Sequence, residues 1–169
     1  LTLIVNGASA KAADLNTLDG KTSVDVTVNA ANVTGNIADV TKVFVTNAAN
    51  FANLGTETVT ISGTVTAAQA DAIADVTNKA VTANIAAGTA TALNTALVDS
   101  GSEVNAYALK ITDTSLNSAA LTNLAVLDGK TSVAVDASAV TTISGSSADV
   151  AAAYVANTAE TITGLGNEK

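Results

Sequence analysis

The sequence predicts an α/β solenoid, with a parallel sheet on one side and short helices on the other. One ten-residue motif occurs twice, as LNTLDGKTSV at residues 15–24 and as LAVLDGKTSV at residues 124–133. Stretches of β-branched residues alternate with helix-like segments at intervals of about 20 to 33 residues, which is typical of solenoid repeats. Ala, Thr and Val dominate the chain, so a core must bury many small side chains in regular layers. A β-solenoid without helices is the alternative.

The predicted helices begin and end at local signals. Thr66 and Gln69 have the spacing of a capping box, and Asn36 and Ser146 each precede an Asp by three residues. Gly20 and Gly129 follow helical segments and fit the left-handed position after a helix. Helices are therefore expected around six apolar positions: Leu15, Val40, Ile73, Leu93, Leu121 and Val150.

The strands are expected between these helices, in stretches that mostly alternate with period two. They lie at residues 1–6, 24–29, 58–63, 81–85, 107–112, 133–136 and 160–163. Strands that alternate with helices favour parallel pairing through right-handed crossovers. We expect all seven to form one sheet, similar in outline to that of leucine-rich repeats.

Alternation divides the residues of this sheet between two faces. The face against the helices is expected to hold Val24, Val26, Val28, Val59, Ile61, Val81, Ile85, Leu109, Ile111, Val133, Val135 and Ile162. The opposite face is rich in threonine, and a solvated surface is its simplest interpretation. If this face binds a ligand, the candidate residues are Thr27, Asn29, Thr58, Thr60, Thr82, Asn84, Thr112, Thr161 and Thr163.

The composition excludes several kinds of catalytic and binding site. The chain has 169 residues and a net charge of −8, with no His or Cys, and its basic residues are all Lys. It therefore has neither a Ser-His-Asp or Cys-His nucleophile system nor a Cys/His zinc site. An acidic chain with 2% aromatic residues offers no basic, stacking surface to nucleic acid. We expect no enzyme activity, and we expect Tyr107 and Tyr154 to fill the core.

Neither of two common ligand-binding motifs, the P-loop and the calcium-binding loop, is complete in the sequence. Gly20-Lys21-Thr22 and its second copy echo a P-loop, but Leu15 and Leu124 stand where that motif needs a further glycine. No Asp-x-Asp-x-Asp-Gly calcium loop is present. No cofactor is expected, although the acidic composition leaves calcium open.

The repeated Leu-Asp-Gly-Lys-Thr-Ser-Val, with Thr-Thr-Ile-Ser-Gly at residues 141–145 and the segment 162–168, resembles tandem segments of giant secreted cell-surface proteins of marine cyanobacteria. Those proteins resemble adhesins or surface-layer components. The resemblance implies an extracellular, structural or adhesive role and brings no catalytic residues.

Residues 1–169 are thus expected to form a single repeat domain of about six strand–helix units. The chain lacks an initiator Met and opens with an apolar strand without a polar cap, so we expect a fragment of a longer array. The predicted function is a non-catalytic structural or adhesive module of a large extracellular surface protein or filament. Its expected partners are neighbouring repeats or copies of itself, joined end to end. The alternative is a module that binds glycan, mineral or ice through the threonine-rich face. No apolar run is long enough to span a bilayer, so no membrane insertion is expected.

Overall fold

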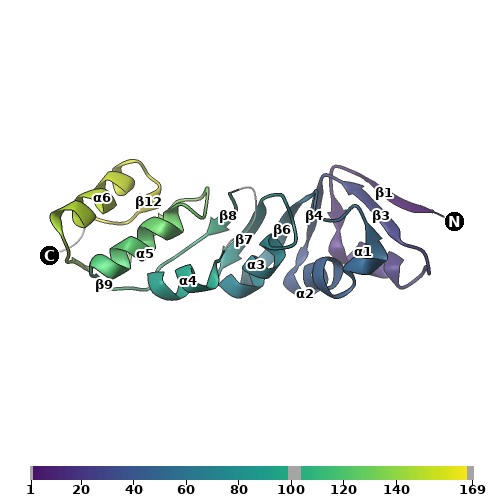
Figure 1. The fold of residues 1–169 in the computed structure, drawn as a ribbon, viewed down its shortest axis with the longest axis horizontal. Helices are drawn as coiled ribbons and strands as arrows, with labels where there is room; N and C mark the ends of the chain where they lie inside the picture. Colours follow the sequence, from purple (N-terminus) through teal and green to yellow (C-terminus); the bar gives the residue numbers. More distant parts are fainter. Residues whose placement is uncertain (1, 99–103, 167–169) are drawn as a thin grey trace.

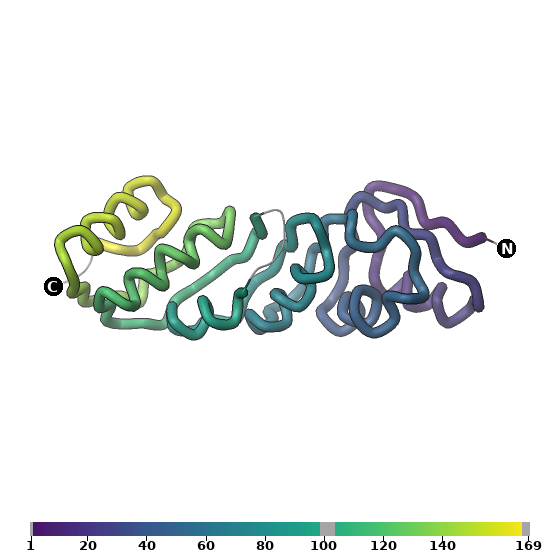
Figure 2. The backbone as a smooth tube through the Cα atoms, in the orientation of Figure 1, coloured from purple at the N-terminus to yellow at the C-terminus, as the bar shows by residue number. Residues whose placement is uncertain are grey.

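The computed structural model describes residues 2–98 and 104–166, and it shows an α/β protein in which parallel strands alternate with helices (Figure 1). The N-terminal and C-terminal ends lie at opposite ends of the long axis. Figure 2 shows the backbone advancing steadily along this axis, so that segments close in sequence lie side by side. The predicted α/β class with parallel strands is therefore confirmed.

In the first half of the chain, two strands precede each α-helix. Its elements are β1 (Leu3–Gly7), β2 (Ala10–Lys11), α1 (Ala12–Asp19), β3 (Val26–Ala30), β4 (Asn32–Asn36), α2 (Ile37–Thr41), the π-helical segment η1 (Lys42–Thr46), the 3-10 turn η2 (Ala48–Asn50), β5 (Phe51–Ala52), β6 (Thr58–Val65) and α3 (Ala67–Ala74).

The second half has shorter strands and longer helices. Its elements are β7 (Val81–Ile85), α4 (Ala90–Ala96), β8 (Ala106–Ala108), β9 (Ser115–Leu116), α5 (Ser118–Asp128), β10 (Val135–Asp136), β11 (Thr142–Ile143), α6 (Ser147–Thr158) and β12 (Ile162–Thr163). The six helices expected from sequence are all present, and each of the seven expected strands overlaps an observed strand.

Every strand pair in the described residues is parallel, and each strand pairs with the corresponding strand one unit further along. Val26 lies opposite both Leu3 and Phe51, and Val59 lies opposite both Val33 and Val81. Isolated bridges continue this pairing beyond β8, at Asn105–Thr131 and Lys110–Asp136. Helices that follow one another in sequence also contact one another, from α1 through α6.

The expected single sheet is instead divided into four. The two larger sheets have the strand orders β1-β3-β5 and β2-β4-β6-β7-β8, and β9-β11 and β10-β12 form two small pairs. The division follows from corners such as Ala31, which separates β3 from β4, and Gly7, the last residue of β1, which has a φ of 134°. The strands missed by the sequence prediction, β2, β4, β5, β9 and β11, are short or contain Asn and Gly, which are poor strand formers.

The core lies between the strands and the helices. Most residues predicted to face the helices are buried, namely Val26, Val28, Val59, Ile61, Val81, Ile85, Leu109, Ile111, Val135 and Ile162. Two are wrong: Val24 is 39% exposed and Val133 is 40% exposed. Both precede their strands, β3 and β10, and lie in the loop of the repeated motif, where no strand pairing directs them inward.

The helix starts agree with the sequence. Thr66 and Gln69 form the full capping box of α3. The side chains of Asn36 and Ser146 accept the backbone N–H of Asp39 and Asp149, as expected. Thr89 and Asn117 cap α4 and α5 in the same way. Each cap satisfies one backbone donor that the first helical turn leaves open.

The prediction for the helix ends is wrong. Gly20 and Gly129 both have a φ of −70°, the right-handed conformation, rather than a positive φ. The last turn continues through each glycine, and the next residue closes it: the N–H of Lys21 bonds the carbonyl of Leu18, and that of Lys130 bonds Leu127. The chain reaches the left-handed region instead at Glu160, after α6, where φ is 61°.

Candidate functional site

The candidate threonine-rich face is only partly assembled. Thr58, Thr60, Thr82 and Asn84 lie on β6 and β7 of the five-stranded sheet, and Thr34, Thr60 and Thr82 are paired in register across three strands. Thr27 and Asn29 lie on β3, in the other large sheet. Thr112 follows the bridge at Ile111, and Thr161 and Thr163 lie at β12. The nine residues therefore belong to several sheets.

Side-chain hydrogen bonds run along these faces from strand to strand. Asn29 donates to Asn6 at 3.1 Å, and Asn53 donates to Asn29 at 2.9 Å, so that three successive strands or loops form an asparagine ladder. Thr58 donates to the Asn32 side chain at 3.2 Å. These groups bond mainly to the neighbouring unit and link the units laterally.

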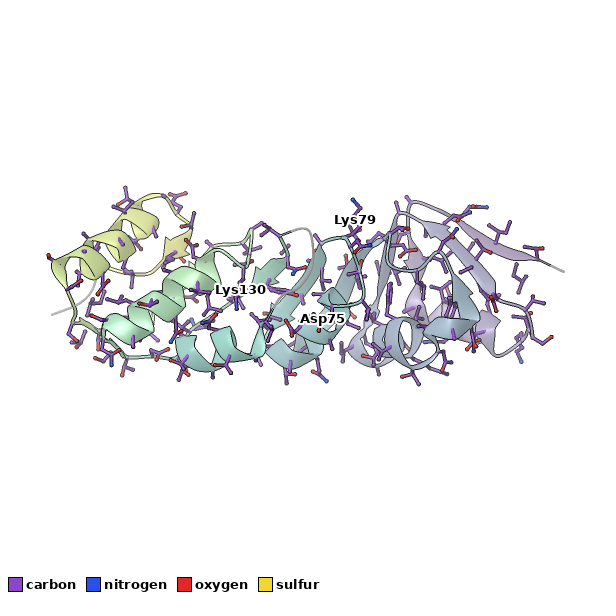
Figure 3. The ribbon with its side chains drawn as sticks, in the orientation of Figure 1. Asp75, Lys79 and Lys130 are labelled. Carbon is purple, nitrogen blue, oxygen red and sulfur yellow. The ribbon has the colours of Figure 1, made fainter. Side chains whose placement is uncertain are left out.

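The repeated motif contains the most informative arrangement. We call its five residues Asp-Gly-Lys-Thr-Ser a connector: the first connector is residues 19–23, and the second is residues 128–132. In the second connector, the Lys130 ammonium donates to the carbonyls of Asn94, at 3.1 Å, and of Leu97. Both carbonyls lie at the C-terminal end of α4, in the preceding unit, and Figure 3 labels Lys130 beside that helix.

Thr131 and Ser132 of the second connector also bind the preceding unit. The Thr131 hydroxyl donates to the Tyr107 carbonyl at 2.8 Å and accepts the Tyr107 N–H at 3.0 Å. Ser132 donates to the Asn105 carbonyl through its backbone N–H, at 2.8 Å, and through its hydroxyl, at 3.2 Å. Lys130, Thr131 and Ser132 thus bind the helix end and the strand start of the unit before.

The Asp of each connector bonds in the opposite direction. Asp128 accepts the hydroxyl of Thr161, in the following unit, at 2.9 Å. Asp19 likewise accepts the side-chain amides of Asn47 and Asn50, at 2.7 and 2.8 Å. A connector therefore joins three consecutive units, with Asp binding forward and Lys-Thr-Ser binding back.

Among the described residues, the side chains of the first connector make no bond to a preceding helix or strand, and only Asp19 bonds forward. Lys21 and Ser23 are exposed, and Thr22 is half-buried. The Thr22 hydroxyl accepts the Val24 N–H at 3.1 Å, just as Thr131 accepts that of Val133 at 3.1 Å. The two loops thus share one local structure, and each borders a small cleft. The first cleft, of about 280 Å³, is lined by Asp19, Thr22, Ser23, Val24, Asp25 and Asn50.

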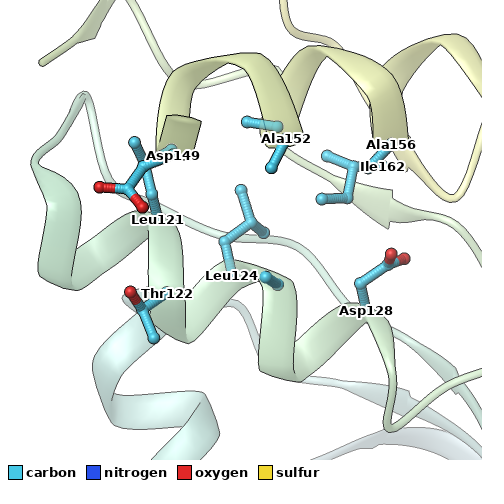
Figure 4. Close-up of a pocket in the computed structure, with 10 residues that line it drawn as sticks. Leu121, Thr122, Leu124, Asp128, Asp149, Ala152, Ala156 and Ile162 are labelled. Atoms are coloured by element: carbon cyan, nitrogen blue, oxygen red, sulfur yellow. The ribbon is translucent and has the colours of Figure 1, made fainter. Parts of the chain in front are cut away.

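The last unit is loosely packed. A largely apolar cavity of about 210 Å³ lies between α5 and α6, and Figure 4 shows Leu121 and Leu124 on one side and Ala152 and Ala156 on the other. Asp128 and Asp149 stand at its rim. Hydrogen bonds from the side chains of Ser146 and Ser118 lower the pKa of Asp149. The cavity exists because α6 presents small alanine side chains to the leucines of α5 and does not fill the space between the two helices.

The outer face of α6 is open. Val155 is 69% exposed and Tyr154 is 37% exposed, and with Ala151, Thr158 and Ala159 they line a shallow apolar groove. The expectation that Tyr154 fills the core is therefore wrong, because it lies on the side of α6 away from α5. Tyr107 is fully buried, as expected.

One buried acid was not anticipated. Glu57 is fully buried, and one of its carboxyl oxygens accepts the N–H groups of Gly55 and Thr56, at 2.9 and 3.1 Å. Its other oxygen has no hydrogen-bond partner among the described residues. Burial raises the pKa of Glu57, and the backbone hydrogen bonds only partly oppose this. A lone Glu between polar residues gives no sequence signal of burial.

Within the described ranges, no three acidic side chains gather closely enough to hold a metal ion. No helix in the same residues is long and apolar enough to cross a bilayer. No family model, curated protein or solved structure matches this chain.

Proposed function

We propose that the chain is a non-catalytic α/β solenoid module that stacks end to end with modules of the same kind, in a structural or adhesive assembly outside the cell. The observation that carries the proposal is the direction of the connector bonds. Each unit is completed by groups from the units before and after it, so a terminal unit presents unused bonding groups.

The strand register supports a solenoid. Paired positions recur once per strand–helix unit, as in Leu3, Val26 and Phe51, and neighbouring units contact through both their strands and their helices. Proteins built in this way bury their core only by stacking neighbours, and their end units need polar caps.

The two ends of the described chain lack such caps. β1 pairs on one side only, with β3, and β12 pairs only with β10 among the described residues. An unpaired edge strand is a template for a further strand. Because the two edges lie at opposite ends of the long axis, head-to-tail contacts repeat without closing and produce a filament.

The extracellular setting rests on the resemblance to secreted surface proteins. The absence of His, Cys and Arg from the sequence supports a non-catalytic role. In this function the polar sheet faces are solvated walls of the assembly, and no cofactor takes part.

Electron microscopy of the purified chain at high concentration tests this proposal. The expected images show unbranched filaments one module wide. Uniformly dispersed single particles at every concentration would contradict it.

The paired threonines favour a second candidate function, in which the five-stranded sheet binds an ordered surface such as ice, mineral or glycan. Thr34, Thr60 and Thr82 repeat across three adjacent strands at the strand spacing of about 4.8 Å. The row stops at β8, where Ala106 pairs with Thr82. Thermal hysteresis that Thr60→Lys abolishes would favour this candidate over stacking.

A further inference from the structure

We propose that the groove between α5 and α6 binds a linear aliphatic diamine, with its methylene chain against the apolar walls and its two ammonium groups at Asp128 and Asp149. This groove is the cavity of about 210 Å³ between the two helices. All of its lining residues belong to one chain, so the proposal goes beyond the proposed function and does not depend on end-to-end stacking. Three features carry it: the apolar walls, a carboxylate at each end, and a lining without Lys.

The walls of the groove suit an alkyl chain. Leu121 and Leu124 of α5 form one side, and Ala152 and Ala156 of α6 form the other (Figure 4). Leu121, Leu124 and Ile162 are buried, whereas Ala152 is exposed, so an apolar floor opens to solvent along α6. Because methylene groups gain free energy by leaving water, this surface favours an aliphatic ligand.

The two carboxylates lie at opposite ends of the apolar surface. Asp149, in the first turn of α6, stands beside Leu121, and Asp128 is the last residue of α5 (Figure 4). The Ser118 hydroxyl, at the start of α5, also bonds the Asp149 carboxylate. Leu121 and Ser118 precede Asp128 by seven and ten residues. The carboxylates are therefore separated by about 10–15 Å along the helix axis.

Both carboxylates are half-buried and are bonded only by neutral groups in the described residues. Asp128 accepts the Thr161 hydroxyl at 2.9 Å, and Asp149 is bonded by the hydroxyls of Ser118 and Ser146. Hydrogen bonds from these two serines lower the pKa of Asp149, which keeps this carboxylate charged. No Lys lines the groove, so its negative charge is available to a cationic ligand.

A linear diamine with about six methylene groups matches this geometry. Its nitrogens stand about 9 Å apart when the chain is extended, and a charge-assisted hydrogen bond of about 2.8 Å at each end brings the span to about 14–15 Å. A monoamine of the same length meets only one carboxylate. A diamine with two methylene groups is too short to reach both.

Titration calorimetry of the natural chain with 1,6-diaminohexane at pH 7 and low ionic strength tests the proposal. The comparison ligands are hexylamine, which has the same chain and one charge, and 1,2-diaminoethane, which has both charges on a short chain. The long diamine is expected to bind at least about tenfold more tightly than either. Equal affinity for one of the comparison ligands would overturn the proposal. So would the absence of saturable binding by about 10 mM, where a millimolar site is mostly filled.

Asp128→Asn and Asp149→Asn each remove one charge and keep the size of the side chain. Each is expected to weaken binding of 1,6-diaminohexane by about tenfold. Asp14→Asn is the matched control, because Asp14 is an exposed acid in the first turn of α1 and should leave the affinity unchanged. If all three variants lose affinity equally, the diamine is only a counter-ion of an acidic chain, and the assigned site is wrong.

Ala156→Leu tests the walls without altering a charge. The larger side chain fills the groove, so the affinity for both 1,6-diaminohexane and hexylamine should fall by at least about tenfold. Ala151→Leu, on the outer face of α6, is the control and should bind as the natural chain does. Circular dichroism checks that each variant is folded. Unchanged affinity in folded Ala156→Leu would place the diamine outside the groove and overturn the proposal.

Discussion

At the scale of single residues, the starts of the helices were predictable and their ends were not. An N-cap is a bond between a side chain and a backbone group three residues away, so sequence spacing alone reveals it. A glycine after a helix permits the left-handed conformation without requiring it. At Gly20 and Gly129 the chain instead continues the right-handed turn, and the N–H of the next residue bonds the carbonyl of Leu18 or Leu127.

This backbone conformation reverses the expected effect of alanine at Gly129. A Cβ there would lie 3.5 Å from the nearest atom, the Val126 carbonyl oxygen, which is ordinary contact. Gly129→Ala is therefore expected to stabilise the fold by about 0.4–1 kcal/mol, because it restricts the unfolded chain. Gly164→Ala is the contrast, since φ is 89° and the Cβ would lie 2.6 Å from the Ser138 nitrogen. It should destabilise by at least about 1–2 kcal/mol. Urea unfolding of both variants tests this prediction. Equal unfolding midpoints would contradict the different backbone conformations of the two glycines.

The buried Glu57 predicts a pH dependence of stability. Because the folded-state pKa lies above the ordinary value of 4.5, the contribution of this group is full below that value and is lost as pH rises through the folded pKa. Glu57→Gln should remove this loss. The variant should therefore gain stability over the natural chain with rising pH, by at most about 1.4 kcal/mol per unit. Urea unfolding at several pH values measures this, with Glu160→Gln, at an exposed residue, as the control. Parallel profiles for the natural chain and Glu57→Gln would count against it.

At the scale of elements, the alternation of helices and strands could be predicted from sequence, because the apolar positions and the cap of each helix lie within the same short segment. The strands β2, β4, β5, β9 and β11 were not readable. Four of them, β2, β5, β9 and β11, contain only two residues each, and pairing with neighbouring strands defines them rather than their own propensity. The division into several sheets has the same origin, since corners at positions such as Ala31 depend on the stacked units.

The second connector should contribute to the stability of a single chain, and the first should not. Lys130→Ala removes the bonds to the end of α4 and is expected to lower the free energy of unfolding by about 1–2 kcal/mol. Lys21→Ala should leave that free energy unchanged in dilute solution, because Lys21 is exposed. Thermal unfolding at low protein concentration compares the two. An equal loss in both variants would mean that Lys21 already has a structural role within the chain.

The last unit should open before the rest of the molecule. α6 has a cavity on its inner side and an exposed apolar groove on its outer side, whereas α5 has a helix on each side. Regions with few apolar contacts open at lower free energy. Hydrogen exchange of a dilute sample should therefore be faster in the amides of α6 than in those of α5. Equal protection of the two helices would show that the terminal unit is as stable as an internal one.

At the scale of the whole molecule, the α/β class with parallel strands could be predicted from sequence, but the bonds that the repeated motif makes to neighbouring elements are visible only in three dimensions. In the sequence, Gly20-Lys21-Thr22 suggests a helix stop or a failed P-loop. In the structure, the second connector bonds to the units on both sides, whereas the side chains of the first connector bond forward through Asp19. The candidate threonine face was the weaker prediction, because its residues alternate correctly along each strand but the strands belong to different sheets.

The central claim is that these modules complete one another end to end. Sedimentation equilibrium of the natural chain over a wide concentration range tests it most directly. Head-to-tail stacking has no closed end point, so the apparent mass should rise continuously with concentration from the monomer mass of 16.5 kDa. A single mass of 16.5 kDa at every concentration would contradict the claim.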